Sequence, residues 1–149
     1  MDLSKLTVGK AEEGVWLNIL HPSTNVPFDP PVRVLLLGED SAHYRGQQHK
    51  INNKRIQQAF AANRGQVKQI VTSEEMDVDT IHSLSTAIKD WENVDWNGSP
   101  MPCNEKNAAL IMREVPWMRE QIKEFVENRA NFFEDSNPTS DDGQSGDSM

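Results

Sequence analysis

Hydrophobic residues near the start of the chain fall into two short runs separated by turn formers. Residues 14–20 and 32–37 are rich in β-branched and large apolar side chains, whereas residues 21–31 are mostly Pro and small polar residues. This pattern predicts an antiparallel β-hairpin. Since a two-stranded hairpin is unstable alone, we expect it to pack on helices or to pair with the edge of another chain. Residues 1–13 are expected to form a flexible arm.

A polar helix is predicted to follow the hairpin. Gly38 ends the second apolar run, and Asp40 and Ser41 are suitable N-cap residues for a helix that ends near Ala62. Its apolar face is thin, so this helix is expected to be marginal in a monomer, and either to depend on oligomer contacts or to be mobile. The apolar positions are Tyr44, Ile51, Ile56, Ala59 and Phe60.

The clearest amphipathic pattern in the chain begins at Thr72. Thr72 and Glu75 match a capping box at the start of a helix. Apolar and small residues then recur at helical spacing, which predicts a single helix that reaches Trp91. These positions are Met76, Thr80, Leu84, Ala87, Ile88 and Trp91. Just before this helix, Val67, Ile70 and Val71 fit either a short strand or a continued helix.

The last third of the chain predicts a turn followed by two helices. Asn97 and Gly98 favour a tight turn. Asn104 is a suitable cap for a helix through about Glu114. Pro116 suits the first turn of a final helix. The apolar positions of that final helix are Val115, Met118, Ile122, Phe125, Val126 and Phe132.

These elements together predict an α+β fold. We expect one mainly helical domain over residues 14–133 with an N-terminal β-hairpin. Residues 134–149 are acidic and rich in Ser and Gly, and they are expected to form a disordered tail. The residues expected in the core are Leu84, Ile88, Trp91, Ile122, Phe125 and Phe132.

Composition narrows the classes of partner. The 149 residues carry a formal net charge of −8, which argues against binding to a phosphate backbone, because that requires clustered Lys and Arg. The longest apolar run, residues 34–37, is far too short to span a bilayer, and the N-terminus has no apolar run of signal-peptide length. Cys103 is the single cysteine, so an intrachain disulfide is impossible and a reducing cytoplasm is expected. Neither nucleic acid nor a membrane is therefore expected as a partner.

Candidate catalytic and metal-binding residues do not form a convincing site. Asp40, Ser41 and His43 include the residue types of a hydrolase triad, but they lie within four residues of one another. A triad draws its members from separate elements, so helix capping is the better interpretation. His43 and His49 are six residues apart and do not share a helical face. We therefore expect no enzymatic activity, no catalytic residue, no metal and no cofactor.

Two charged groups have alternative interpretations. One group is basic, and it either contacts an acidic partner, contacts the acidic tail of a neighbouring copy, or is simply solvated. The other is acidic and lies at the start of the predicted amphipathic helix. It either forms a dicarboxylate site or, as the better interpretation, is stabilised there by the helix dipole. The basic group is Lys50, Lys54, Arg55 and Arg64, and the acidic group is Glu74, Glu75, Asp77 and Asp79.

Partner-binding positions are expected among aromatic and basic residues. Trp117 lies off the apolar stripe of the final helix, so it either packs on the preceding helix or faces a partner, where Trp is enriched in hot spots. Cys103 is expected to be an inert small residue, because nothing nearby in the sequence would activate its thiol. The candidate partner-binding residues are Trp16, Tyr44, Arg45, Trp117 and Arg119.

The order of motifs over residues 91–133 resembles a known family. W-E-N-V leads into a turn with N-G, then N-E-K-N-A, and then P-W-M-R-E-Q-I-K-E-F-V-E-N-R-A-N-F-F. In the N-terminal half, G-V-W-L-N-I-L precedes L-L-L-G-E-D-S-A-H-Y-R. In this combination the chain resembles the tail assembly chaperones of long-tailed bacteriophages, in particular those of HK97-like siphophages. The resemblance covers most of residues 14–133 and excludes the acidic tail.

This resemblance implies a non-enzymatic role in phage tail morphogenesis. Such chaperones keep the long, coil-forming tape measure protein soluble, help recruit tail tube protein around it, and are absent from the finished virion. The resemblance also implies a location in the host cytoplasm and self-association into multimers. Many members exist in a short form and a frameshift-extended form, and the acidic tail is then expected to end the short form. The alternative is a small phage adaptor such as a head–tail joining protein, which remains in the particle.

Overall fold

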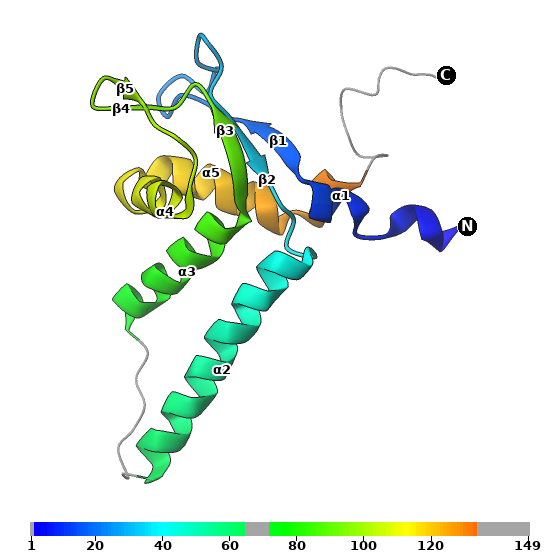
Figure 1. Ribbon diagram of the computed structural model, residues 1–149, viewed down its shortest axis with the longest axis vertical. Helices are drawn as coiled ribbons and strands as arrows, with labels where there is room; N and C mark the ends of the chain where they lie inside the picture. Colours follow the sequence, from blue (N-terminus) through cyan, green and yellow to red (C-terminus); the bar gives the residue numbers. More distant parts are fainter. Residues whose placement is uncertain (1, 65–71, 134–149) are drawn as a thin grey trace.

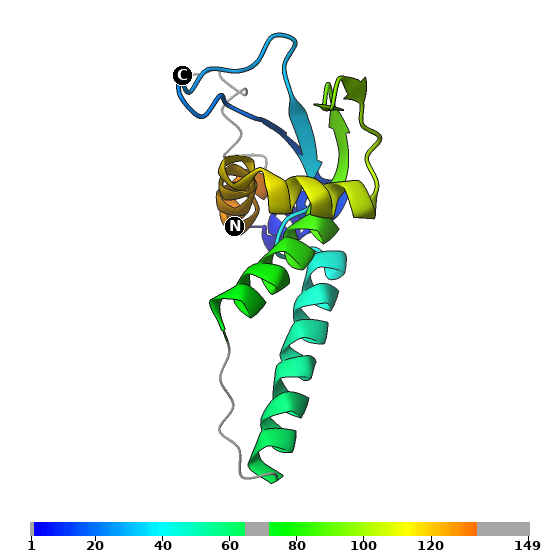
Figure 2. The same cartoon turned by 90° about the vertical axis from the view of Figure 1, so that its left-hand side faces the viewer.

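The computed structural model describes residues 2–64 and 72–133 of the chain. Its fold is α+β and mainly helical, which confirms the predicted fold class. A small sheet packs against two helices, and a second pair of helices projects from this body (Figures 1 and 2). The helices are η1 (Leu3–Leu6), α1 (Gly9–Glu13), α2 (Ala42–Arg64), α3 (Ser73–Ala87), α4 (Glu105–Glu114), α5 (Pro116–Glu127) and η2 (Arg129–Phe132). The strands are β1 (Val15–Asn18), β2 (Arg33–Leu36), β3 (Ile88–Glu92), β4 (Asp95–Trp96) and β5 (Ser99–Pro100).

The predicted hairpin is confirmed, but it belongs to a larger sheet. β1 and β2 pair in antiparallel fashion, with Val15 opposite Leu36 and Asn18 opposite Arg33. β3 pairs with the other edge of β2, which gives the strand order β1-β2-β3. The β2 edge of the hairpin is therefore covered by β3 of the same chain. The outer edge of β1 has no partner strand in this three-stranded sheet.

The predicted helix that reaches Trp91 is wrong in its last part. α3 ends at Ala87, and the chain passes directly into β3. A β-bulge explains the helix-like spacing, because the register against β2 shifts within β3. Ile88 and Trp91 are therefore both buried although they lie three residues apart on a strand. Met76, the first residue of the predicted stripe, is exposed rather than buried.

The expectation of a flexible arm over residues 1–13 is wrong for α1. Ala11 of this short helix is buried, and its carbonyl accepts a hydrogen bond from Gly38 N at 3.0 Å. The side chain of Glu12 accepts a hydrogen bond from Ala42 N at 2.6 Å. The close approach requires glycine at position 38, since a Cβ there would lie 2.8 Å from that of Ala11. These contacts anchor α1 at the start of α2.

α2 is the longest helix and carries little buried apolar surface. Ser41 caps it, because its Oγ accepts a hydrogen bond from Tyr44 N at 3.2 Å. With 23 residues the helix is about 34 Å long, and it extends away from the sheet (Figures 1 and 2). Tyr44 near its start is buried, whereas Ile56 and Phe60 near its end are exposed. The thin apolar face that the sequence predicts is thus confirmed.

α3 lies antiparallel to α2, and polar contacts join the two helices. Gln48 donates a hydrogen bond to Ser83 Oγ at 2.7 Å. Further along, Arg55 pairs with Glu75 at 2.8 Å and also with Asp79. We call α2 and α3 together the helix pair.

The basic group predicted on α2 divides between two roles. Lys54 Nζ lies 3.2 Å from Asp79 Oδ1, and Arg55 pairs with the same carboxylate. These two residues hold the acidic start of α3 against α2. Lys50 forms no ion pair with any residue in the described part of the chain.

The predicted starts of the three later helices and the predicted turn are confirmed. Thr72 Oγ1 accepts from Glu75 N at 3.1 Å, and Asn104 Oδ1 accepts from Asn107 N at 2.8 Å. Pro116 occupies the first turn of α5. Between β4 and β5, Asn97 and Gly98 have φ values of 53° and 82°, the left-handed backbone that a two-residue hairpin turn requires.

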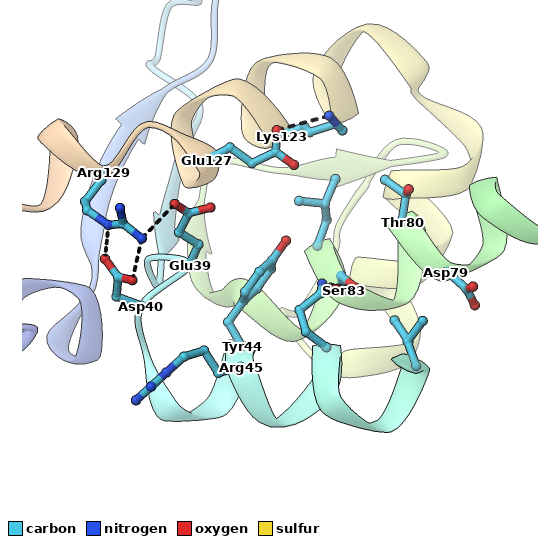
Figure 3. Close-up of a pocket in the computed structure, with 13 residues that line it drawn as sticks. Glu39, Asp40, Tyr44, Arg45, Asp79, Thr80, Ser83, Lys123, Glu127 and Arg129 are labelled. Carbon is cyan, nitrogen blue, oxygen red and sulfur yellow. Dashed lines mark hydrogen bonds and ion pairs between the residues drawn. The ribbon is translucent and has the colours of Figure 1, made fainter. Parts of the chain in front are cut away.

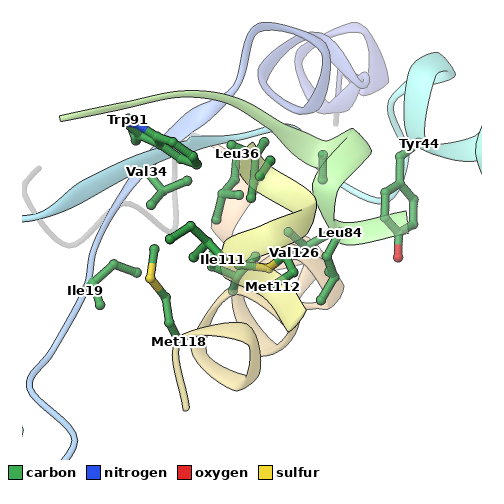
Figure 4. Close-up of a cluster of buried hydrophobic side chains, with 14 of the residues drawn as sticks. Ile19, Val34, Leu36, Tyr44, Leu84, Trp91, Ile111, Met112, Met118 and Val126 are labelled. Carbon is green, nitrogen blue, oxygen red and sulfur yellow. The ribbon is translucent and has the colours of Figure 1, made fainter. Parts of the chain in front are cut away.

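The core lies between one face of the sheet and helices α3, α4 and α5 (Figure 4). Trp91 closes it on the strand side, where its indole N–H donates to Met101 O at 2.7 Å. The side chains that are almost fully buried include Ile19, Val34, Leu36, Leu84, Met112, Ile122 and Val126.

Two predictions lie outside the described residues. One is the strand-or-helix alternative at Val67, Ile70 and Val71. The other is the disordered tail at residues 134–149.

Candidate binding surfaces

An open groove lies where the helix pair meets α5 and η2 (Figure 3). Its volume is about 520 Å³, and its walls come from the first half of α2, the second half of α3 and the end of α5. Glu39 and Asp40 close one end, just before α2 begins. Two of the predicted partner-binding residues, Tyr44 and Arg45, line this groove together.

Tyr44 adds its hydroxyl to the largely polar wall of the groove. Its ring packs in the core, and its hydroxyl points toward α5 (Figures 3 and 4). Burial raises the pKa of Tyr44, and the nearby carboxylates Glu127 and Glu39 raise it further. The phenol is therefore neutral at physiological pH and offers a hydrogen bond to whatever enters the groove.

A bidentate ion pair fixes the end of the groove. Arg129 Nε lies 2.5 Å from Asp40 Oδ2, and its Nη2 lies 2.9 Å from Asp40 Oδ1. The same Nη2 is 3.5 Å from Glu39. The hydrogen bond from Arg129 holds the pKa of Asp40 below its usual value. This pair ties η2 to the start of α2, across 89 positions of sequence.

The groove suits binding of a polar segment. Lys123 and Glu127 pair with each other at 3.1 Å along α5. Arg45 is exposed at the rim and forms no ion pair with any described residue. Within residues 2–64 and 72–133, no group of three or more His, Cys, Asp or Glu is placed to hold a metal ion.

A second surface lies at the far end of the helix pair. Ile56 and Phe60 on α2 are 56% and 66% exposed, and Met76 and Val78 on α3 are 60% and 51% exposed. The antiparallel pairing places the end of α2 beside the start of α3, so all four residues lie toward the same end. We call these four residues the tip. Exposed large apolar side chains near one end of a helix pair are candidates for a contact surface.

Trp16, a third predicted partner-binding residue, lies on the sheet rather than at the groove. It faces away from buried Val34 and Leu36, and the guanidinium of Arg33 lies 4.6 Å from its ring centroid. Arg33 also pairs with Glu92 of β3 at 2.7 Å. The cation–π contact and the ion pair together link all three strands on the outer face of the sheet.

Trp117 and Arg119 make contacts within the chain. Trp117 stacks on Phe28 of the loop between β1 and β2, with ring centroids 6.2 Å apart. The helical pattern gives no sign of this partner, since the loop is remote in sequence. Arg119 donates a hydrogen bond to Met112 O at 3.2 Å and so holds the end of α4. The binding roles assigned to all five candidates from the sequence stay predictions.

Five of the six residues expected in the core are buried, although Ile88 and Trp91 lie on β3 rather than on the predicted helix. Phe125 is only partly buried and packs edge-on against Phe132, at 5.5 Å between centroids. Cys103 is also partly buried, and burial followed by the charge of Asp90 raises its thiol pKa to about 11. The fully or largely buried members of the expected core are Leu84, Ile88, Trp91, Ile122 and Phe132.

Comparison of this chain with models of protein families, with curated proteins and with solved structures gives no match. Among the described residues, none of the helices combines the length and the apolar character needed to cross a membrane.

Proposed function

We propose that this chain is a phage tail assembly chaperone that acts in the host cytoplasm. It binds the tape measure protein, keeps it soluble and helps recruit tail tube protein around it. The sequence resemblance over residues 14–133 motivates the proposal. The structural observation that supports it is the helix pair, which projects from the core and exposes apolar side chains at its tip.

The tip has the spacing of a helix-binding surface. Ile56 and Phe60 are four residues apart on α2, so they lie on one side of that helix. Two helices that pack side by side use such pairs as anchors, and a coil-forming client offers many equivalent positions along its length. Four apolar side chains are few compared with the roughly 20–30 residues that each partner contributes to a stable interface, so binding is weak and reversible. A chaperone that leaves before the virion is complete needs this property.

Coexpression with the tape measure protein from the same genome tests the proposal. The measurement is the soluble fraction of the tape measure protein, with and without this chain. The double variant Ile56→Glu/Phe60→Glu should reduce that fraction to the level without chaperone. Val26→Glu is the matched control, because Val26 is equally apolar and 54% exposed but lies in the hairpin loop. It should keep full activity.

Two results would contradict the proposal. If the wild-type chain does not change the solubility of the tape measure protein, the chaperone function is wrong. If the chain is present in purified particles at a fixed ratio, a head–tail joining protein is the better assignment. If the double variant works as well as wild type, the client binds at a site other than the tip. Circular dichroism of both variants checks that they fold.

A further inference from the structure

α2 has a charge opposite to that of the chain as a whole. Its 23 residues include five Lys or Arg and no Asp or Glu, whereas the complete chain has a net charge of −8. Positive charge on this protein is thus concentrated on one projecting helix. A helix of this kind attracts negatively charged segments.

Part of this positive charge is not neutralised by the described residues. Arg45 and Lys50 form no ion pair with them, and Lys54 leaves half of its side chain exposed beside Asp79. Lys50 and Lys54 are four residues apart and share one side of α2. They line a shallow pocket of about 190 Å³ together with Asp79 and His82 of α3, and Asp79 is already paired with Lys54 and Arg55. This side of the helix pair is the basic face.

Residues 134–149 have the complementary composition. They contain five Asp or Glu and no Lys or Arg. The acids occur as two adjacent pairs, Glu134–Asp135 and Asp141–Asp142, followed by Asp147. No other part of the sequence of this length has so many acids without a base.

The described chain ends beside the start of α2, within reach of the basic face. A Cβ at Gly38 would lie 3.0 Å from the ring of Phe132, and Arg129 pairs with Asp40. Lys50 lies about 12 Å along α2 from its first residue. The eight residue-to-residue steps from Phe133 to Asp141 span up to about 28 Å when extended. The length of chain is therefore sufficient for Asp141 to reach Lys50 in the same molecule.

We propose that residues 134–149 bind the basic face of α2 within the same chain, chiefly through Asp141 and Asp142 with Lys50 and Lys54. The contact covers Lys50 and the exposed part of Lys54. Because the charges involved are exposed, it is weak and is screened by salt. This inference does not depend on the chaperone function, and its test uses no client protein.

Zero-length crosslinking of the full chain tests this contact. A water-soluble carbodiimide joins a carboxylate to a lysine amine only when the two groups meet, and mass spectrometry locates the new amide. At low salt we expect Asp141 and Asp142 to crosslink to Lys50 and Lys54, and 0.5 M NaCl should lower the yield several-fold. The Lys54–Asp79 pair, at 3.2 Å, provides an internal positive control.

Lys106 is the matched control lysine. It is exposed on α4 and, like Lys50, forms no ion pair with a described residue. If Asp141 and Asp142 react with Lys106 as often as with Lys50 and Lys54, or do not react with α2 at all, the inference is wrong.

A mixture of isotopically light and heavy chains distinguishes contact within one chain from contact between copies. Crosslinked peptides that pair light with light and heavy with heavy support the proposal. Peptides that pair light with heavy in statistical proportion would overturn it, since the tail would then bind a neighbouring copy. The variant Lys50→Arg/Lys54→Arg keeps the charge and removes the amines, so it should abolish these crosslinks without exposing new sites.

Discussion

Ile122 illustrates how single side chains stabilise this core. It lies on α5 and is fully buried in the core, whereas Phe125, one turn later on the same helix, is only partly buried. Ile122→Ala is expected to lower the free energy of unfolding by about 2–5 kcal/mol, because it leaves a cavity. Phe125→Ala should cost less than Ile122→Ala, since part of the ring already contacts water. Urea denaturation of both variants measures the difference, and a larger loss for Phe125→Ala would show that its ring is covered in solution.

The thiol of Cys103 should react slowly. Burial raises its pKa to about 11, so at pH 8 the thiolate fraction is roughly 100-fold below that of an ordinary cysteine. Alkylation by iodoacetamide should accordingly be slow at pH 8 and should accelerate as the pH rises toward 11. Denatured protein serves as the reference. Equal rates for folded and denatured protein at pH 8 would mean that the thiol is accessible and unshifted.

Asp40 should stabilise the fold only while it is ionised. Its pKa is lowered by the hydrogen bond from Arg129, and a lowered carboxyl pKa contributes stability above the unfolded pKa of about 3.9. That contribution disappears as the pH falls through the lower folded value. Asp40→Asn should therefore be less stable than wild type at pH 7, by a small amount because the pair is largely exposed, and equally stable in strong acid. Asp95→Asn is the control for the loss of a carboxylate, because Asp95 is exposed on β4 and forms no ion pair with a described residue.

At the scale of elements, Arg55 is the main polar link in the helix pair. It contacts both Glu75 and Asp79, and the hydrogen bond from Arg55 lowers the pKa of Glu75. Arg55→Met keeps most of the side-chain stem but removes the charge. Amide hydrogen exchange in the first two turns of α3 should then become faster, while exchange in α5 should not change. Unchanged exchange in α3 would show that apolar packing alone holds the helices together.

The elements that the sequence predicts well are those defined by local contacts. Ser41, Thr72 and Asn104 each cap a helix through a hydrogen bond to a residue three positions later, and such signals are visible in the chain itself. β3 is different, because its pairing with β2 joins residues more than 50 positions apart. Its bulge also spaces the buried positions Ile88 and Trp91 as a helix would, so periodicity alone assigns the wrong element.

Parts of the binding surfaces that depend on neighbouring residues were likewise predictable from the sequence. Tyr44 and Arg45 are adjacent on one helix, so their shared location follows from the sequence. The Asp40–Arg129 pair and the stack of Arg33 on Trp16 depend on tertiary contacts and strand register, which no local pattern encodes. The tip was missed for another reason. Apolar spacing on α3 suggests that Met76 is buried, and only the projection of the helix pair leaves it exposed.

At the scale of the whole molecule, we expect self-association. β1 is an edge strand, and the tip exposes apolar residues on both helices of the pair, so two kinds of surface favour contact between copies. The net charge of −8 opposes close packing, so association should be weak and should decrease at low salt. Sedimentation over a wide concentration range measures it. A strict monomer at high concentration and moderate salt would contradict this expectation.

The direct passage from α3 into β3 has a mechanical consequence. No loop separates Ala87 from Ile88, and the N–H of Ile88 still donates to Leu84 O, so the last turn of the helix and the first residue of the strand form one stiff piece. The helix pair is therefore connected to β3 without a flexible hinge at this point. A force applied at its outer end is transmitted to β3, an edge strand of the sheet that contains the buried Trp91, and is not absorbed by a hinge.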